Sequence, residues 1–327
     1  MESSPVLMAL TLARPTVARY AQSRRRPEKL SGPASFGEVR GVLQGFSGLD
    51  APAPRKVPPV AAALVIVGGG RMGEALTEGL LRSGLALPDE MVVVEALAER
   101  RAELSAGLAA RFPGVTVAPE PVAAAGGVIA VKPADVEAAC RLLSDAGVPR
   151  VLSIAAGVSL ASLESWLGDD RAVIRAMPNT PALVGAGAAA IAGGRRAGEE
   201  DLAWAEEILG AVGTVVRVAE PLLDAVTGLS GSGPAYVFLV AEALIEGGVL
   251  AGLSRPDSRR LAIQTLLGSA RLLAESGEEP EALRASVTSP GGTTAAGLRV
   301  LEKAAVRSAF LEAVMAATER SRRLGGG

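Results

Sequence analysis

Three glycines stand between an apolar run and a helical pattern near residue 68. Residues 62–84 read AALVIVGGGRMGEALTEGLLRSG. The branched apolar residues at 64–67 predict a buried strand, and the pattern that follows predicts a helix that ends at Gly84. A turn with so few side chains can cradle a phosphate, close tightly on itself or act as a flexible hinge.

The spacing of these glycines favours the phosphate cradle. Gly68, Gly70 and Gly73 fit the pattern G-x-G-x-x-G. In that pattern the first glycine permits the turn, the second lets the backbone approach a pyrophosphate, and the third lets the helix pack closely on the strand. The strand before and the helix after supply the context that the motif requires. Because the chain has 39 glycines, an accidental match and a purely structural turn stay open.

Composition limits the chemistry that this chain can perform. Its 327 residues, 49% of them hydrophobic, suffice for one large or two ordinary domains with a substantial core. There is no histidine, and Cys140 is the only cysteine, so we expect no disulfide within the chain and no metal site. The net charge of −2 and the few aromatic residues also argue against nucleic acid as a partner.

Short β-rich runs alternate with helical patterns from residue 64 to 218, which is typical of a mostly parallel sheet covered on both faces. The runs are LVIV (64–67), MVVV (91–94), VIAV (128–131), VLSI (151–154), AVIRA (172–176), AAAIA (188–192) and TVVRV (214–218). Beyond residue 220 we expect only helices, at 222–252, 256–276, 280–287 and 294–323. The sequence therefore predicts an α/β fold: a Rossmann-type, doubly wound domain at 61–220, then an all-helical domain at 221–327.

The apolar run at 235–253 is long enough to span a bilayer, but Glu242 and Glu246 lie near its middle. We interpret it as a buried helix and expect no membrane. A helix that is apolar all round needs a cover, which predicts self-association.

Residues 1–60 have a different composition. They carry nine Lys or Arg against four acids and end in the proline-rich piece APAPRKVPP. A transit segment to a plastid or mitochondrion is one interpretation, and an unstructured extension of a cytoplasmic protein is the other.

Three predicted strand ends carry residues suited to a ligand, because ligands of α/β sheets bind at the carboxyl ends of strands. They are AVKP (130–133), SIAAG (153–157) and RAMPNTP (175–181). Lys132 and Asn179 offer polar groups, while Ala155 and Ala156 leave room for a flat ring.

Glu95 ends the second predicted strand, where an acid can bind the ribose hydroxyls of NADH and repel the 2′-phosphate of NADPH. Arg100 and Arg101 follow closely and could bind that phosphate, so the donor stays open between NADH and NADPH.

Far downstream, residues 287–302 read VTSPGGTTAAGLRVLE. Pro290 and the two glycines after it predict a turn with exposed amides, and Thr293 or Thr294 is a natural N-cap for the helix that follows. Amides, hydroxyls and a helix N-terminus can together hold a carboxylate.

Taken together, these segments resemble the pyrroline-5-carboxylate reductase family from about residue 62 to 323. The longest matching stretches are DAVTGLSGSGPAYVF at 224–238 and PEALRASVTSPGGTTAAGLRVLE at 280–302. The resemblance implies hydride transfer from NADPH or NADH to 1-pyrroline-5-carboxylate, giving L-proline, the last step of proline synthesis. It also implies a helical dimerisation domain and, often, rings of dimers.

The resemblance also assigns site residues. The substrate carboxylate is expected on Ser289, Gly291, Gly292, Thr293 and Thr294, with Thr294 as the candidate for relaying a proton and Asn179 as a further substrate contact. The cofactor is expected on the glycine turn and the strand ends: Gly68, Gly70, Arg71, Met72, Gly73, Glu95, Ala130, Val131, Lys132, Pro133, Ala155 and Ala156.

Two other functions share this plan. A related dehydrogenase acting on hydroxy acids or other imines usually has a catalytic lysine in the first interdomain helix, and residues 262–273 contain none. A nucleotide-sensing module would use the cofactor fold but has no use for SPGGTT.

Overall fold

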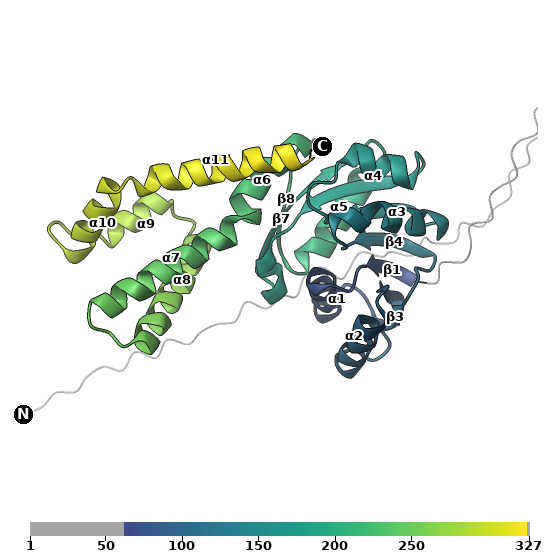
Figure 1. The fold of residues 1–327 in the computed structure, drawn as a ribbon, viewed down its shortest axis with the longest axis horizontal. Coiled ribbons are helices and arrows are strands. Elements are labelled where there is room, and N and C mark those ends of the chain that lie inside the picture. Colours follow the sequence, from purple (N-terminus) through teal and green to yellow (C-terminus); the bar gives the residue numbers. More distant parts are fainter. Residues whose placement is uncertain (1–61, 326–327) are drawn as a thin grey trace, which may run out of the picture. The chain divides into compact units, whose positions relative to one another are not determined.

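The computed structural model of the protein describes residues 62–325. An eight-stranded sheet forms the first part of these residues. The strand order is β3-β2-β1-β4-β5-β6-β7-β8, and every neighbouring pair is parallel except β6 and β7. Figure 1 shows the sheet with helices on its two faces. The strands are β1 (Ala62–Val67), β2 (Met91–Val94), β3 (Thr116–Ala118), β4 (Ala124–Ile129), β5 (Arg150–Ser153), β6 (Ala172–Met177), β7 (Gly187–Gly193) and β8 (Gly213–Arg217). The mostly parallel, doubly wound sheet is therefore confirmed.

Two strands differ from the expectation. The edge strand β3 was missed, because its three residues, TVA, are too few to show a pattern. The expected strand VIAV (128–131) is shifted: β4 begins at Ala124 and ends at Ile129, so Ala130 and Val131 lie beyond its end. Its first half, AAGG, has small side chains because Trp204 covers Gly126 and Leu143 covers Gly127.

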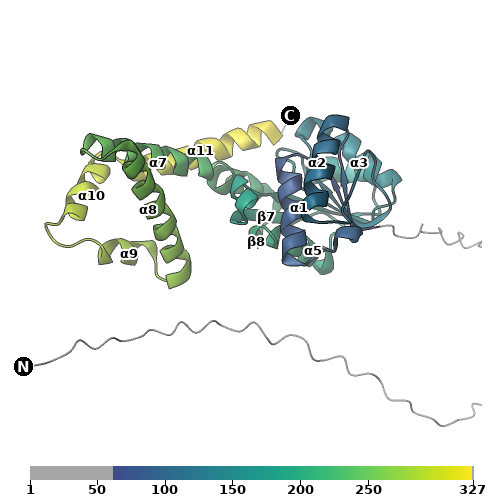
Figure 2. The ribbon, with the colours of Figure 1, turned by 90° about the horizontal axis from the view of Figure 1, so that it is seen from below.

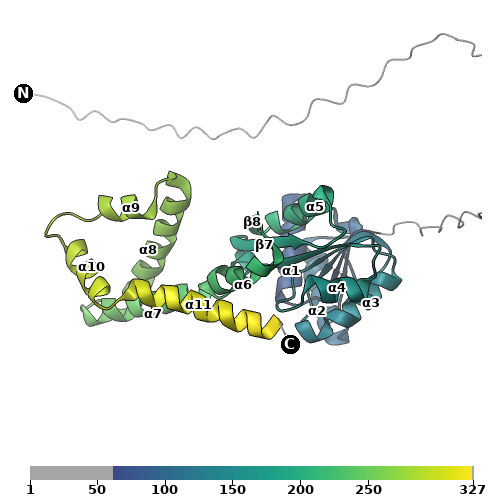
Figure 3. The ribbon, with the colours of Figure 1, turned by 90° about the horizontal axis from the view of Figure 1, so that it is seen from above.

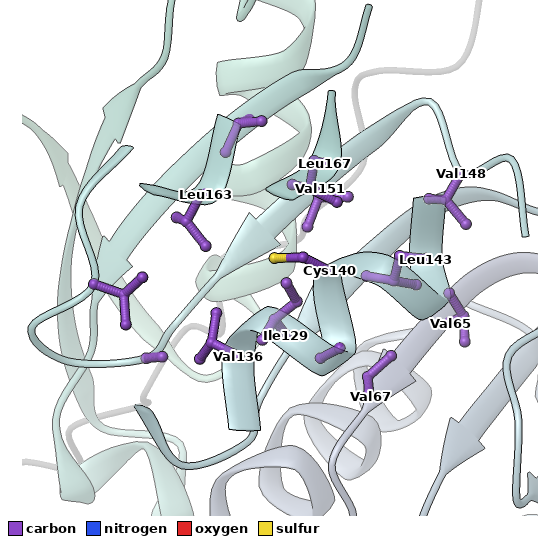
Figure 4. Packing of buried hydrophobic residues seen from close by; sticks show 14 of the residues in the cluster. Val65, Val67, Ile129, Val136, Cys140, Leu143, Val148, Val151, Leu163 and Leu167 are labelled. Atoms are coloured by element: carbon purple, nitrogen blue, oxygen red, sulfur yellow. The ribbon is translucent and has the colours of Figure 1, made fainter. Parts of the chain in front are cut away.

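Helices cover both faces of the sheet, and each face has its own core (Figure 3). On one face lie α3 (Val136–Asp145) and α4 (Leu160–Leu167); on the other lie α1 (Arg71–Ser83) and α5 (Glu199–Gly210). Figure 4 shows Cys140 of α3 packed between Ile129 and Val151 of the sheet. Fully burying an aliphatic side chain contributes about 1.5–3 kcal/mol, so these two layers stabilise the sheet.

The strand order reverses between β1 and β4, because β1 pairs with β2 on one side and with β4 on the other. In a doubly wound sheet this reversal opens a crevice at the carboxyl ends of the two strands. The turn after β1 and the residues after β4 both lie at that edge. The fold thus places the glycine turn at the entrance to the crevice.

The second part of the chain is helical. Its elements are η4 (Glu220–Leu222), α6 (Leu223–Val226), the π-helical turn η5 (Thr227–Gly231), α7 (Gly233–Leu250), α8 (Arg255–Ser276), α9 (Pro280–Ser286), α10 (Thr293–Lys303) and α11 (Val306–Gly325). Helices α7 and α8 lie side by side, and α11 packs on α6 and η5. Figure 2 shows the chain leaving α8, passing through α9 and returning in α10 toward α11.

One expected helix is broken. The single helix expected at 294–323 is two helices, α10 and α11, because Ala305 between them has a φ of 54°. A non-glycine residue in the left-handed region cannot continue a right-handed helix. Apolar periodicity continues through the break, which is why the pattern alone did not reveal it.

The apolar helix α7 is not buried within its own chain, so the cover expected for residues 235–253 has to come from outside it. Within the described residues no side chain of α7 counts as buried, and Phe238 and Leu239 are 63% and 66% exposed. By length and composition alone, Glu220–Leu250 is also apolar enough to cross a membrane. An exposed apolar surface of this kind is typical of a helix that packs against another apolar surface outside its own chain.

Candidate functional site

The glycine turn follows β1 directly, and its three glycines have three different roles. Gly68 has a φ of 112°, and a Cβ on it would lie 2.6 Å from the carbonyl oxygen of Ala130. A Cβ on Gly73 would collide with the carbonyl oxygen of Gly68. By contrast, none of the described residues lies within 4 Å of a Cβ built on Gly70. The protein itself therefore requires glycine at 68 and 73, whereas the space beside Gly70 is open.

Helix α1 begins immediately after this turn. Gly70 is its N-cap and offers no side chain, so the first amides of the helix, at Arg71 and Met72, have no side-chain cap. The N-terminus of a helix attracts anions through these amides and the helix dipole. Space beside Gly70, free amides and a helix N-terminus together fit a pyrophosphate.

Glu95 follows β2 and lies against the turn. Its Oε2 accepts a hydrogen bond from Gly69 N at 3.1 Å, and its Oε1 accepts one from Leu97 N at 2.9 Å. The carboxylate is thus held next to the glycine turn, where the sequence placed the ribose of the cofactor.

Arg100 and Arg101 are less available than the sequence suggested. Arg100 donates to the carbonyl oxygen of Gly69 at 3.0 Å and to Oε2 of Glu74 at 2.6 Å. Arg101 donates to the carbonyl oxygen of Glu95 at 2.8 Å. The hydrogen bond to Glu74 raises the pKa of the Arg100 guanidinium, which stays charged. Both arginines hold the turn and the end of β2 in place.

The strand ends enclose a recess of about 280 Å³. Six predicted site residues line it: Met72, Ala130, Val131, Ala155, Ala156 and Asn179. Five further residues were not predicted as site residues: Ile154, Met177, Pro178, Thr180 and Gly231. The first four lie within the segments SIAAG (153–157) and RAMPNTP (175–181), which the sequence analysis placed at strand ends. Their position at a strand end was therefore the signal that could have identified them. Gly231 belongs to the helical part of the chain. Its only signal in the sequence was its position within the stretch 224–238 that resembles the family.

Besides the three glycines of the turn and Glu95, three predicted cofactor residues lie outside this recess: Arg71, Lys132 and Pro133. Lys132 is exposed at the start of the short helix η2 (Pro133–Asp135), and Pro133 begins that helix. Arg71 lines a separate hollow of about 560 Å³ beside α1, together with Glu74 and other charged residues. No carboxyl end of a parallel strand in the described part of the chain lines that hollow, so the smaller recess is the better candidate for a ligand site.

Asn179 has its polar groups engaged by the protein. Its Oδ1 accepts a hydrogen bond from Ala188 N at 2.8 Å, and its Nδ2 donates one to Ser230 O at 3.1 Å. The sequence presented Asn179 as a polar group offered to a substrate. In the structure its amide connects the end of β6 with the π-turn of the helical part.

The turn expected at 289–294 is present. Gly291 has a φ of 68°, and Gly292 N donates to Ser289 O at 3.0 Å. The expected threonine cap is wrong: Gly292 is the N-cap of α10, and Thr293 is the first helical residue. The helix N-terminus therefore carries backbone amides without a side-chain cap, which suits an anionic ligand. Among the described residues that line the strand-end recess, none belongs to 289–294.

The sheet, the glycine turn and the recess at the switch point define a dinucleotide-dependent oxidoreductase with a helical second part. Comparison with known families makes this specific. Residues 220–324 match the family model described as pyrroline-5-carboxylate reductase dimerisation. Residues 63–157 match the model described as NADP oxidoreductase coenzyme F420-dependent.

Individual relatives agree with the family models. The chain is 48% identical over 267 residues to a pyrroline-5-carboxylate reductase of Synechocystis, across 80% of this chain and 98% of that protein. The solved reductase of Coxiella burnetii superposes with a TM-score of 0.75 at 34% identity, covering 81% and 98% of the two chains. The Plasmodium falciparum reductase, solved with NADP bound, gives 0.68 at 28% identity, covering 81% and 98%. This chain belongs to the pyrroline-5-carboxylate reductase family.

Proposed function

We propose that this protein reduces 1-pyrroline-5-carboxylate to L-proline by hydride transfer from NADH or NADPH, the last step of proline synthesis. The observation that carries the proposal is the strand-end recess lined by Met72 of α1, just after the glycine turn, in a chain 48% identical to a reductase of this name. The nicotinamide cofactor, when bound, supplies the hydride. The residues of the protein supply binding, orientation and exclusion of water.

The cofactor site consists of the turn, the start of α1 and the strand ends. The amides at Arg71 and Met72 bind the pyrophosphate beside Gly70, and Glu95 binds the adenosine ribose. Ala155 and Ala156 follow β5, and their small side chains leave the recess wide enough for the flat nicotinamide ring.

The carboxylate of the substrate binds at the turn 289–294. The amides of Gly291 and Gly292, the hydroxyls of Ser289 and Thr293, and the N-terminus of α10 form a site for an anion without any arginine. Thr294 holds the carboxylate or the ring nitrogen and relays a proton when the imine arrives neutral. No histidine is needed, since a protonated cyclic imine requires only a hydride.

A second copy of the chain completes the site. The recess of one chain lacks residues 289–294, and the dimerisation family model covers 220–324, which includes that turn. The exposed apolar face of α7, with Phe238 and Leu239, gives the second copy a surface to cover. The turn of one protomer then faces the recess of its partner. We further propose that such dimers can assemble into rings.

The compartment is a prediction from the sequence alone. Residues 1–60 lie outside the described residues, so both the cytoplasm and a plastid or mitochondrion stay open. Comparing the N-terminal residue of the mature protein with Met1 would distinguish the two.

The test of the proposed function is proline formation from the imine with each donor. The Thr294→Ala variant should lower turnover by about a hundredfold while leaving cofactor affinity within about twofold, because Thr294 belongs to the substrate site. Thr116→Ala, at an exposed position of the edge strand β3, is the matched control and should behave as wild type. An absence of proline with wild-type protein, or unchanged kinetics in Thr294→Ala, would contradict the proposal.

A further inference from the structure

The helical part contains one irregular turn where it meets the sheet domain. In η5, Thr227–Gly231, the N–H of Ser232 donates to the carbonyl oxygen of Thr227 at 2.8 Å, five residues back. Such π-turns are rare in α-helices and often mark functional sites. This one lies directly before α7, in the segment TGLSG.

Asn179 fixes this turn from across the domain boundary. Its Nδ2 can only donate and its Oδ1 can only accept, so the bonds to Ser230 O and Ala188 N determine the orientation of the amide. The partners are 51 and 9 residues away in sequence. Asn179 is also the only asparagine in the 327 residues.

The residue after Ser230 reaches the reaction site. Gly231 lines the strand-end recess together with Met177 and Asn179. A Cβ on Gly231 would lie 2.6 Å from Cε of Met177. The π-turn is therefore in close contact with the wall of the recess, and small movements of the turn change the shape of that wall.

Helix α11 holds the opposite side of the same turn. A Cβ on Gly228 would lie 2.6 Å from the carbonyl oxygen of Val314 and would collide with Oγ1 of Thr318. The hydroxyl of Tyr236 donates to the carbonyl oxygen of Gly228 at 3.2 Å. The turn is thus clamped between α11, which belongs to the dimerisation segment, and Asn179, which belongs to the sheet domain.

We propose that Asn179 is a positioning residue for hydride transfer: its amide holds the π-turn so that Gly231 forms a wall of the recess in which nicotinamide and imine meet. This rests on the proposed function. It replaces the earlier assignment of Asn179 as a substrate ligand, since its acceptor oxygen and one of its two N–H groups bind the protein. Misplacing reacting groups by about 1 Å can cost a hundredfold in rate.

The Asn179→Asp variant separates the two hydrogen bonds. The aspartate keeps an oxygen for Ala188 N–H but presents a second oxygen, instead of a donor, to Ser230 O. We expect kcat for proline formation to fall at least tenfold, with KM for imine and cofactor within about twofold. The primary isotope effect with donor deuterated at the transferred position should rise, because hydride transfer becomes rate-limiting.

A second pair of variants changes the contact between Gly231 of the π-turn and Met177 of the recess wall. Gly231→Ala should lower kcat in the same way, and adding Met177→Leu, which removes the terminal methyl that the new Cβ would meet, should restore at least part of the loss. With ¹⁵N in the asparagine side chain, the single labelled amide should shift in Gly231→Ala and return toward its wild-type position in the double variant.

Each other outcome overturns the inference. A raised KM for the imine with unchanged kcat would make Asn179 a substrate ligand. Full kcat in Asn179→Asp, or a loss that only follows the fraction of folded protein measured by circular dichroism, would leave the amide with a scaffolding role. Failure of wild-type protein to form proline would instead contradict the proposed function.

Discussion

The carboxylate of Glu95 accepts a hydrogen bond from the backbone N–H of Gly69, with 3.1 Å between Oε2 and N. Arg100 donates to the carbonyl oxygen of the same glycine at 3.0 Å. A carboxylate and a guanidinium therefore hold the two polar groups of one residue in the glycine turn. We expect their opposite charges to have opposite effects on a donor that carries a 2′-phosphate.

Replacing Glu95 with Ser should change the choice of donor. Removing the carboxylate removes its repulsion of the 2′-phosphate and one acceptor for the ribose hydroxyls. We expect the ratio of kcat/KM for NADPH to that for NADH to rise about tenfold, equivalent to about 1.4 kcal/mol. Steady-state kinetics with both donors measures this. Glu99→Ser, on the exposed first turn of α2 (Ala98–Arg111), is the control, and an equal loss with both donors would show that Glu95 does not select.

Gly70→Ala tests the pyrophosphate site without disturbing the fold. A Cβ at this position meets none of the described residues within 4 Å, so thermal stability should stay unchanged. Affinity for the donor, measured by titration of nicotinamide fluorescence, should fall about tenfold because the methyl group occupies the approach of the pyrophosphate. Gly210→Ala, at the end of α5 with similar open space, is the control. Unchanged affinity in Gly70→Ala would favour the purely structural turn.

Phe238→Glu should weaken self-association. This phenylalanine of α7 is 63% exposed in the single chain, within the segment that matches the dimerisation family model. Burying a glutamate in an apolar interface is unfavourable, so the dissociation constant should rise at least tenfold. Sedimentation equilibrium measures it, with Leu142→Glu on α3 as the control. Wild-type protein that sediments as a monomer at micromolar concentration would contradict the dimer.

Glu164 should make stability depend on pH. Burial alone would raise its pKa, but the hydrogen bonds from the backbone N–H and the guanidinium of Arg195 hold it below the ordinary value of 4.5. A carboxyl with a lowered pKa stabilises the fold above its unfolded-state pKa, and the stabilisation is lost as the pH falls. Glu164→Gln should therefore lower the free energy of unfolding by roughly 1–3 kcal/mol at pH 7.

Comparing wild type with Glu164→Gln at acid pH tests whether the charge of Glu164 is responsible for the difference in stability. The difference in urea midpoint between wild type and Glu164→Gln should narrow as the pH falls from 7 through 4.5 toward 3. Glu200→Gln, at an exposed position of α5, should show little difference at any of these values. A difference that stays constant with pH would mean that the charge of Glu164 does not matter.

Periodicity and turn chemistry predicted much of the fold. The buried strands β1, β2, β5 and β6 are rich in branched apolar residues, so they were predicted within two residues at each end. The edge strand β3 was not predicted, because three half-exposed residues carry no pattern. The break at Ala305 was missed for a different reason: an alanine with positive φ has no signal in the sequence.

The candidate site could be predicted in part. The glycine turn and the strand-end alanines follow local rules of spacing and position, and the structure brings them together around one crevice. The two bonds of Asn179 could not be foreseen, because Ser230 is far away in sequence. The need of α7 for a cover could be predicted from its apolar composition, but the pattern did not show that Phe238 and Leu239 are among the side chains left exposed in one chain.

We propose that the glycine turn of one protomer and the turn 289–294 of its partner form one site. The test is to mix equal amounts of two inactive variants, Gly70→Val and Thr294→Ala, and let them dissociate and reassociate. In a mixed dimer one site would combine an intact recess with an intact turn, so proline formation should recover to about a quarter of the wild-type rate. Activity no greater than the sum of the two separate variants would contradict the shared site.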